Sequence, residues 1–181
     1  MRLASFWTKW ADKISSLFKK ADDSPQNIQI DLLPSTPGDL EDLARHLCGG
    51  KKRKSIRKLY NPETLEANPS QFMDTRTPTE LSVDRVSTLS LSEAFQLGWK
   101  FFTEGPANDP NKTYHGFAKL LTRHCREAQC EVVAATYNGE KPYHANIQYP
   151  REVKEDDMEY ANILAKKTEV QLIPEAPKYI D

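Results

Sequence analysis

The segment 79–103 constrains the fold most, because its hydrophobic period changes from two to about 3.6 within a few residues. Leu81 and Val83 alternate with polar residues, as a short half-buried β-strand requires. Ser90 is followed three residues later by Glu93, which is the S-x-x-E pattern of a reciprocally capped helix start. The apolar residues after this cap recur at helical spacing and form one wide face: Ala94, Phe95, Leu97, Gly98, Phe101 and Phe102. A strand that runs directly into a capped helix predicts the folding core of an α+β domain.

Length and composition predict one folded domain with appended segments. The chain has 181 residues, and domains of about 100–150 residues are the commonest size. Only 38% of the residues are hydrophobic and 12 are proline, so we expect a core in 39–173 and a tail over 174–181. The 25 basic and 26 acidic side chains nearly cancel, which argues against a globally basic nucleic-acid-binding protein but not against a local basic patch.

Cysteine usage and hydropathy indicate a cytoplasmic protein. Cys48, Cys125 and Cys130 are an odd number at no metal-ligand spacing, so we expect reduced thiols and no structural metal. No run approaches the roughly 20 apolar residues that a membrane-spanning helix needs. The first residues also lack the uninterrupted apolar region and the small-residue cleavage site of a signal peptide.

Residues 1–20 form a strongly amphipathic pattern that predicts a separate helix. Its apolar face, which we expect to bind a partner, consists of Phe6, Trp7, Trp10, Ile14, Leu17 and Phe18. Five cations and one acidic residue lie outside that face. Such a helix suits a groove on a partner protein, the protein's own core or the surface of a membrane, and we rank the membrane surface below the other two. The linker composition of 21–38 detaches the helix from the domain and supports docking on a partner.

A cluster of cations follows the first predicted element of the domain. Thr36 or Asp39 can cap a helix that runs to about Cys48, where a glycine pair ends it. The predicted inner side of this helix contains Leu40, Leu43, Ala44 and Leu47. The basic loop 49–58 then supplies the expected nucleic-acid-binding residues: Lys51, Lys52, Arg53, Lys54, Arg57 and Lys58. Six clustered cations can hold a phosphate backbone, but they also suit a solvated basic loop or a nuclear-import signal.

The second half of the chain predicts two more helices and three more strands. We expect helices over 114–128 and 151–168, and strands over 130–137, 144–149 and 170–173. The Asn138-Gly139 pair between the first two of these strands has hairpin-turn chemistry. The elements together predict an α+β fold, in which a small antiparallel sheet of 3–4 strands is packed by 3–4 helices and the N-terminal amphipathic helix stays separate.

Common catalytic motifs are missing from the chain. Nothing matches H-E-x-x-H, paired C-x-x-C motifs, a P-loop, G-x-S-x-G or G-x-G-x-x-G. These absences argue against zinc hydrolases, NTPases, common α/β-hydrolases and dinucleotide enzymes. We therefore expect no catalytic centre, no metal site and no cofactor.

An alternative catalytic set consists of Arg85, His115 and His144. If the strand that carries Arg85 pairs with the strand that starts at His144, these side chains and a tyrosine meet at one end of the sheet. One histidine would then take the 2′-OH proton of RNA, another would protonate the leaving oxygen, and the arginine would stabilise the phosphorane. The simpler interpretations are structural: a buried Arg85 that bonds a carboxylate or loop carbonyls, and a strand-end His144 that holds a backbone carbonyl.

The segments LSVDR (81–85) and YHANI (143–147) are the most distinctive short motifs of the chain. With FQLG (95–98) and YHGF (114–117), they resemble the motifs of a group of small uncharacterised bacterial proteins. The resemblance covers about residues 40–165. It implies one folded unit over that range and no particular activity, and it leaves the N-terminal helix outside.

These observations predict a non-enzymatic accessory or adaptor subunit of a bacterial multiprotein assembly, of the kind that serves anti-phage defence or is linked to a toxin. The N-terminal helix docks a protein partner in this interpretation, and the basic loop contacts nucleic acid. Two alternatives remain open. The first is a small metal-independent nuclease or phosphate-handling enzyme, and the second is a peripheral membrane protein attached through the first helix.

Overall fold

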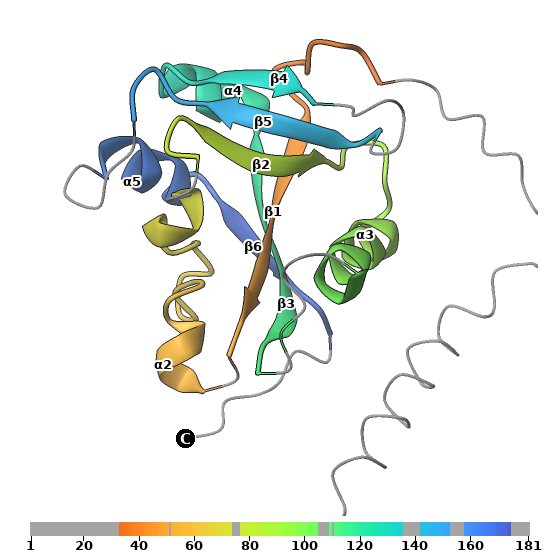
Figure 1. Cartoon of the computed structure of the whole chain (residues 1–181), viewed down its shortest axis with the longest axis vertical. Coiled ribbons are helices and arrows are strands. Elements are labelled where there is room, and N and C mark those ends of the chain that lie inside the picture. The colour runs from red at the N-terminus through yellow and green to blue at the C-terminus, as the bar shows by residue number, and fades with distance from the viewer. Residues whose placement is uncertain are drawn as a thin grey trace, which may run out of the picture. The chain divides into compact units, whose positions relative to one another are not determined.

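The structure is a computed structural model that describes residues 33–50, 52–73, 77–104, 109, 111–135, 142–152 and 158–174. The chain divides into two units, Met1–Asp31 and Leu32–Asp181, and the second unit contains the whole described fold (Figure 1). The amphipathic helix predicted over 1–20 and the tail after residue 174 lie outside the described residues. The same holds for the Asn138-Gly139 turn.

One antiparallel sheet of six strands organises this unit, in the order β4-β5-β2-β1-β3-β6. The strands are β1 Asp42–Gly49, β2 Glu80–Arg85, β3 Thr113–Leu121, β4 Glu131–Ala134, β5 His144–Gln148 and β6 Glu169–Leu172. The described helices are α2 Arg53–Ile56, α3 Leu91–Glu104, α4 Thr122–Glu127 and α5 Glu159–Ala165, with a 3₁₀ turn η1 at Pro69–Phe72. The α+β class with an antiparallel sheet is confirmed. The predicted size of 3–4 strands is wrong, because the sheet has six.

Both additional strands come from segments that the sequence assigned to helices. The helix predicted from Thr36 or Asp39 to Cys48 is strand β1, and most of the helix predicted over 114–128 is strand β3, with only α4 helical. β1 and β3 pair along almost their whole length, from Asp42↔Leu121 to Gly49↔Thr113. Both strands lie inside the sheet and are covered on both faces, so their apolar residues do not alternate with polar ones.

The local signals around β2 and α3 are confirmed. Ser90 N donates to Glu93 Oε2 (2.7 Å), and Glu93 N donates to Ser90 Oγ (3.3 Å), which is the reciprocal cap that the sequence predicts. β4 and β5 form the predicted antiparallel pair, and β6 is the predicted edge strand. The predicted helix over 151–168 is present as α5, while residues 153–157 lie outside the described residues.

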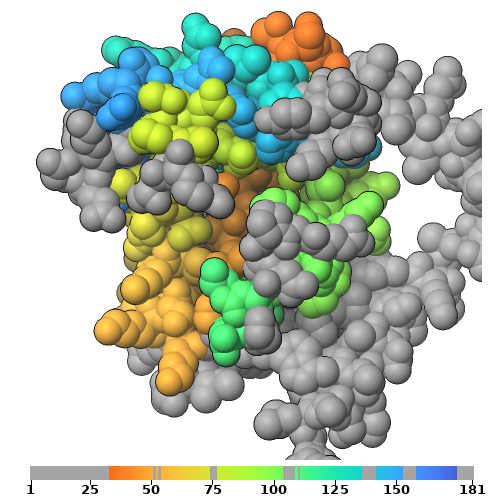
Figure 2. All heavy atoms as spheres, viewed as in Figure 1, coloured from red at the N-terminus to blue at the C-terminus, as the bar shows by residue number. Residues whose placement is uncertain are grey.

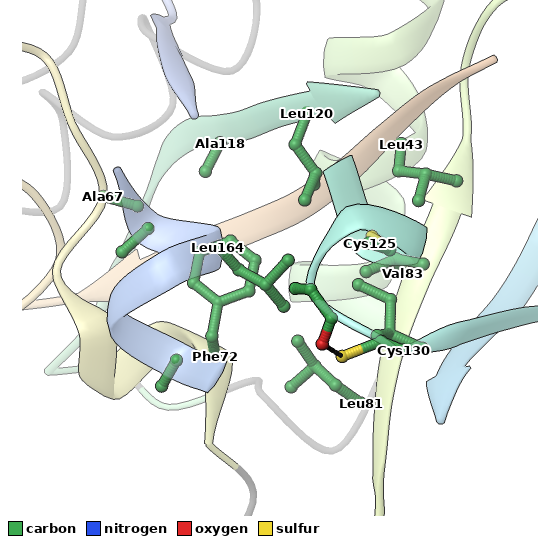
Figure 3. Packing of buried hydrophobic residues seen from close by; sticks show 14 of the residues in the cluster. Leu43, Ala67, Phe72, Leu81, Val83, Ala118, Leu120, Cys125, Cys130 and Leu164 are labelled. Atoms are coloured by element: carbon green, nitrogen blue, oxygen red, sulfur yellow. Dashed lines mark hydrogen bonds between the residues drawn. The ribbon is translucent and has the colours of Figure 1, made fainter. Parts of the chain in front are cut away.

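The two faces of the sheet are covered by different elements (Figure 1). The larger core contains Leu43, Leu81 and Ile147 of the sheet and receives side chains from α2, η1, α4 and α5, including Phe72 and Leu164 (Figure 3). The smaller core lies on the other face and joins Ala44, Tyr114 and Phe117 to α3 through Phe95 and Phe102. This division puts successive residues of one strand into different chemical surroundings.

β1 and β2 pair over only two positions, Leu43↔Arg85 and Ala44↔Asp84. Where the strands separate, Arg45 bridges the opening: its Nη1 donates to the carbonyl of Ser82 (3.0 Å) and its Nε donates to the carbonyl of Gln71 (2.9 Å). The arginine thereby satisfies backbone acceptors that lack a ladder partner at this point.

Candidate functional site

The basic segment, Lys51–Lys58, is built around a short helical turn instead of the irregular loop expected from its composition. It is described from Lys52 onward. Ile56 N donates to the carbonyl of Lys52 (3.0 Å), and Leu59 N donates to the carbonyl of Ile56 (2.8 Å). The side chain of Ile56 is buried in the larger core with Leu59 and Tyr60 just after the segment. These apolar side chains fix the turn to the domain.

A second stretch of chain, Asn61 to Gln71, braces the basic segment from one side. Asn68 N donates to the carbonyl of Leu59 (2.8 Å), and Tyr60 forms a β-bridge with Ala67. The side-chain amides of Asn68 and Gln71 donate to the carbonyls of Arg57 (3.1 Å) and Lys58 (2.9 Å). Because the carbonyls of the basic segment are held by neighbouring side chains, its backbone is fixed before any ligand binds.

The four cations of this segment whose side chains the structure describes are exposed. Within the described part of the chain, no ion pair is made by Lys52, Lys54, Arg57 or Lys58. Other surface cations do pair: Arg126 contacts Asp39, and Arg151 contacts Glu159 at 2.9 Å. Figure 2 shows the segment, in orange-yellow at the lower left, projecting from the surface of the domain. Lys51 lies outside the described residues, and the side chain of Arg53 is also outside them.

A hollow of about 470 Å³ adjoins the basic segment. Its lining combines one cation, two carboxylates, two amides, two prolines and a floor of buried residues: Arg57, Tyr60, Asn61, Pro62, Glu63, Glu66, Ala67, Asn68 and Pro69. Arg57 belongs to both the basic segment and the hollow. The sequence marks turns at the two Asn-Pro pairs, but their approach to each other depends on the folded chain.

A second polar cluster lies on the opposite face of the sheet, under α3. The carboxylate of Asp84 is 2.9 Å from His46 Nε2 and 3.5 Å from His144 Nδ1. His46 Nδ1 is 3.1 Å from Tyr114 Oη. When Nε2–H of a neutral His46 donates to Asp84, its Nδ1 is the acceptor for the Tyr114 hydroxyl. The four groups therefore form one hydrogen-bonded chain from Tyr114 to His144.

Helix α3 encloses most of this cluster. Gly98 lies directly over it, and a Cβ at that position would collide with Tyr114 Oη and His46 Nδ1. Phe101 stacks on the imidazole of His46, with ring centroids 6.1 Å apart. The side chains of His46, Asp84 and His144 are 6%, 15% and 16% exposed. This degree of enclosure suits a structural connection between sheet and helix better than a substrate site.

Acid is expected to remove the contribution of Asp84 to stability. Burial opposes its charge, but hydrogen bonds from His144 and His46 outweigh burial and lower the pKa of Asp84 from 3.8 to about 2. A lowered pKa stabilises the folded state above the unfolded value of about 4, by roughly 2 kcal/mol, and this stability is lost as the pH falls towards 2. Urea unfolding at a series of pH values should therefore show a shallower decline below pH about 4 for Asp84→Asn than for the wild type.

The control for this prediction is Asp109→Asn, which replaces a half-exposed carboxylate 3.9 Å from Lys112 with an amide whose oxygen can still accept from Asn111 N. Its free energy of unfolding should follow that of the wild type within about 0.5 kcal/mol at every pH. Parallel pH profiles of Asp84→Asn and the wild type would show that the two histidines do not stabilise the carboxylate.

The alternative catalytic set is not assembled. β2 and β5 do pair, with Asp84 opposite His144, but Arg85 is the next residue along β2 and faces the other side of the sheet. Arg85 is 1% exposed, binds both oxygens of Glu41 and donates to the carbonyl of Pro34 (2.7 Å). His115 is buried at the β1–β3 irregularity, with its Nε2 3.3 Å from the carbonyl of Gly49. Arg85 and His144, which the alternative interpretation brings together, therefore lie on opposite faces of the sheet, and Arg85 makes the ion pair and carbonyl contact of the structural interpretation.

Sequence reasoning missed the residues that His144 does meet. His46 lies within the segment that the sequence predicts as a helix, and Asp84 lies within the LSVDR motif without a signal of its own. Their proximity follows from the pairing of Ala44 with Asp84 and of Asp84 with His144, which places the three positions on one face. The alternation of side chains along a strand is enough to predict that Asp84 and Arg85 face opposite sides of the sheet. Which residues of β1 and β5 lie beside Asp84 depends on how the strands pair, and the sequence alone does not show this.

The chain has no match among family models, curated proteins or solved structures. Within the described ranges, no helix is long and apolar enough to cross a membrane. No group of three His, Cys, Asp or Glu side chains in those ranges is arranged to hold a metal ion. The functional interpretation therefore depends on the chemistry of the two polar regions themselves.

Proposed function

We propose that this chain is a non-enzymatic accessory subunit that binds nucleic acid through the basic segment and a protein partner through residues 1–20. One observation carries the proposal: four exposed cations lie on an anchored turn and make no ion pair in the described part of the chain. The amphipathic pattern of residues 1–20, the missing catalytic motifs and the local basic patch together support a subunit of a bacterial assembly, of the anti-phage or toxin-linked kind. Free thiols at Cys48, Cys125 and Cys130 support a cytoplasmic compartment.

The physical argument for nucleic acid starts from the net charge of −1 on the whole chain. A nearly neutral protein has no long-range attraction for a polyanion, so binding depends on local charge within a Debye length of about 8–10 Å. The basic segment supplies such local charge. Its backbone is already ordered, so binding a phosphate backbone costs mainly the ordering of lysine and arginine side chains. The attraction should be strong at low salt and should weaken steeply as salt increases.

The direct test is binding of a fluorescently labelled single strand of about ten nucleotides to the full chain. We expect binding at about 50 mM salt and a large loss of affinity by about 200 mM. Fluorescence anisotropy measures both. The absence of binding at the lower salt concentration would contradict the nucleic-acid part of the proposal.

The partner part of the proposal rests on residues 1–20. Among the described residues, the two cores of the second unit are formed by residues between Leu43 and Val170. The first segment has an apolar face with two of the three tryptophans of the chain. An amphipathic face of this kind is suited to a hydrophobic groove on another protein.

Deletion of residues 1–20 is expected to abolish co-purification of the protein partner and to leave unfolding of the domain unchanged. Trp7→Glu with Trp10→Glu should have the same effect, because it places two charges on the apolar face. Lys13→Gln is the matched control on the polar face and should retain the partner. Unchanged co-purification after the deletion would contradict partner docking, and flotation of the full chain, but not of the deletion variant, with anionic vesicles would favour membrane attachment instead.

A nuclease that uses Arg85 and His144 is not proposed. The guanidinium of Arg85 is bound to Glu41 on one face of the sheet, whereas His144 lies with Asp84 on the other. His46, the second histidine beside Asp84, is only 6% exposed, and both of its ring nitrogens are engaged. Among the described residues around Asp84, the side chains of Arg85 and His144 therefore do not form the pair of accessible groups that the alternative mechanism needs.

A further inference from the structure

We propose that the hollow beside the basic segment binds an unpaired guanine base of a single strand whose phosphates lie on the basic segment. This inference rests on the proposed nucleic-acid function and specifies what the site selects. The shared residue is Arg57, which lines the hollow and belongs to the basic segment. A strand whose phosphate is held by Arg57 would therefore have a neighbouring base within reach of the hollow.

The hollow is formed by backbone that is held in place. Asn61 N donates to the carbonyl of Glu66 (2.8 Å), and Leu65 N donates to the carbonyl of Asn61 (2.9 Å). Ala67 N donates to Thr168 Oγ1 (2.9 Å), which ties this stretch to the start of β6. The volume of about 470 Å³ lies within the range of about 300–1,000 Å³ that is typical of small-ligand pockets. A site of this size accepts one base and has little need to rearrange.

The charges of the lining decide which part of a nucleotide enters. Glu63 and Glu66 are exposed carboxylates on the wall of the hollow, and they repel a phosphate group. A cationic guest is disfavoured in turn by the exposed guanidinium of Arg57, which also lines the hollow. A neutral base whose edge donates hydrogen bonds satisfies both conditions.

Guanine fits this requirement best among the four bases. Its Watson–Crick edge presents the N1–H and N2–H donors side by side, so one carboxylate accepts both in a bidentate arrangement. Adenine and cytosine each offer one amino group beside a ring-nitrogen acceptor on that edge, and uracil or thymine offers a single N–H, so none of them makes the paired contact. Asn61 Oδ1 accepts from Glu63 N (2.9 Å) and fixes the turn that carries this carboxylate, while the guanidinium of Arg57 offers a plane for stacking on the base.

The test compares single strands of about ten uridines in which one central position is guanine, inosine or adenine. We expect the full chain to bind the guanine strand at least about fivefold tighter than the adenine strand at equal salt. Inosine lacks the N2 amino group and should give an intermediate affinity. Glu63→Gln with Glu66→Gln should bring the guanine-to-adenine ratio close to one, although removal of two negative charges raises the affinity for every strand. A DNA strand with the same bases should show the same ratio, because the contact involves the base alone.

The control is Glu131→Gln, an exposed carboxylate on β4 that does not line the hollow, and it should keep the wild-type ratio. Equal affinity of the wild type for all three strands would overturn the guanine inference and leave the proposed function intact. Failure to bind any strand would instead contradict the proposed function itself. A preference for guanine that survives both glutamate substitutions would place the recognition elsewhere on the protein and would also overturn the inference.

Discussion

Replacing Arg85 with methionine is expected to lower the free energy of unfolding by about 3–5 kcal/mol, the largest stability effect of any single change considered. Arg85 is 1% exposed and holds two acceptors: the carboxylate of Glu41, with Nη2 to Oε2 at 2.9 Å, and the carbonyl of Pro34 at 2.7 Å. Methionine keeps most of the buried volume but leaves Glu41 charged and only 12% exposed. The carboxylate would keep the hydrogen bond from Gly38 N (3.1 Å) but lose its only cationic partner among the described residues, and this loss accounts for most of the expected effect. Urea unfolding monitored by circular dichroism measures it.

Two comparisons separate this charge effect from a loss of packing. Arg85→Met with Glu41→Gln should be more stable than Arg85→Met alone, because the second substitution removes the stranded charge. Arg126→Met is the matched exposed case, since Arg126 also holds the chain that precedes β1, through Asp39 and the carbonyl of Pro37. Its side chain is 38% exposed, so its loss should cost about 1 kcal/mol or less. Equal costs for Arg85→Met and Arg126→Met would contradict the structural role assigned to Arg85.

The largest effect on binding is expected when the basic segment loses its exposed charges. The variant carries glutamine at four positions: Lys52, Lys54, Arg57 and Lys58. Each phosphate contact on a single strand contributes about 0.7 to the exponent of the salt dependence, so four lost contacts should weaken binding by about two to three decades near 0.1 M salt. All four side chains are exposed, so the free energy of unfolding should change little.

A matched control removes the same charge elsewhere on the domain. Glutamine replaces four exposed cations outside the basic segment: Lys100, Arg123, Lys166 and Lys167. Both variants change the net charge from −1 by four units to −5. If binding depended only on net charge, both variants would lose affinity equally. We expect the control variant to keep most of the wild-type affinity, because its cations do not lie together on one anchored turn.

Elements with strong local signals could be predicted from the sequence. α3 is fixed by the Ser90–Glu93 cap and an apolar face, both of which are short-range features. β2, β4 and β5 are short strands that alternate or adjoin turn residues, and each was located to within a few residues. In these segments the pattern along the chain and the final packing agree, so no knowledge of the neighbouring strands was needed.

β1 could not be predicted, because its surroundings in the sheet override its local pattern. Leu43, Ala44 and Leu47 recur at helical spacing, yet Leu43 and Leu47 face the larger core while Ala44 faces the smaller one. A strand buried on both faces loses the alternation that identifies a strand. Leu40, which completed the apparent helical face, is 74% exposed.

Only one part of the candidate site could be predicted from the sequence. The basic segment is visible in the sequence because six cations occur within eight residues, and its exposure follows directly from their charge. The hollow requires Tyr60 to meet Ala67, and the cluster at Asp84 requires the register of β1, β2 and β5. These features arise from pairing between distant segments, which a single sequence without internal repeats does not specify.

The salt dependence of single-strand binding tests the central claim most directly. The logarithm of the association constant is measured against the logarithm of salt concentration, from about 50 to 200 mM, for the wild type and for the variant that lacks four cations of the basic segment. We predict a slope between about −3 and −4 for the wild type and a reduction of its magnitude by about 2.8 in the variant. Equal slopes for the two proteins would show that the phosphates lie elsewhere and would contradict the account.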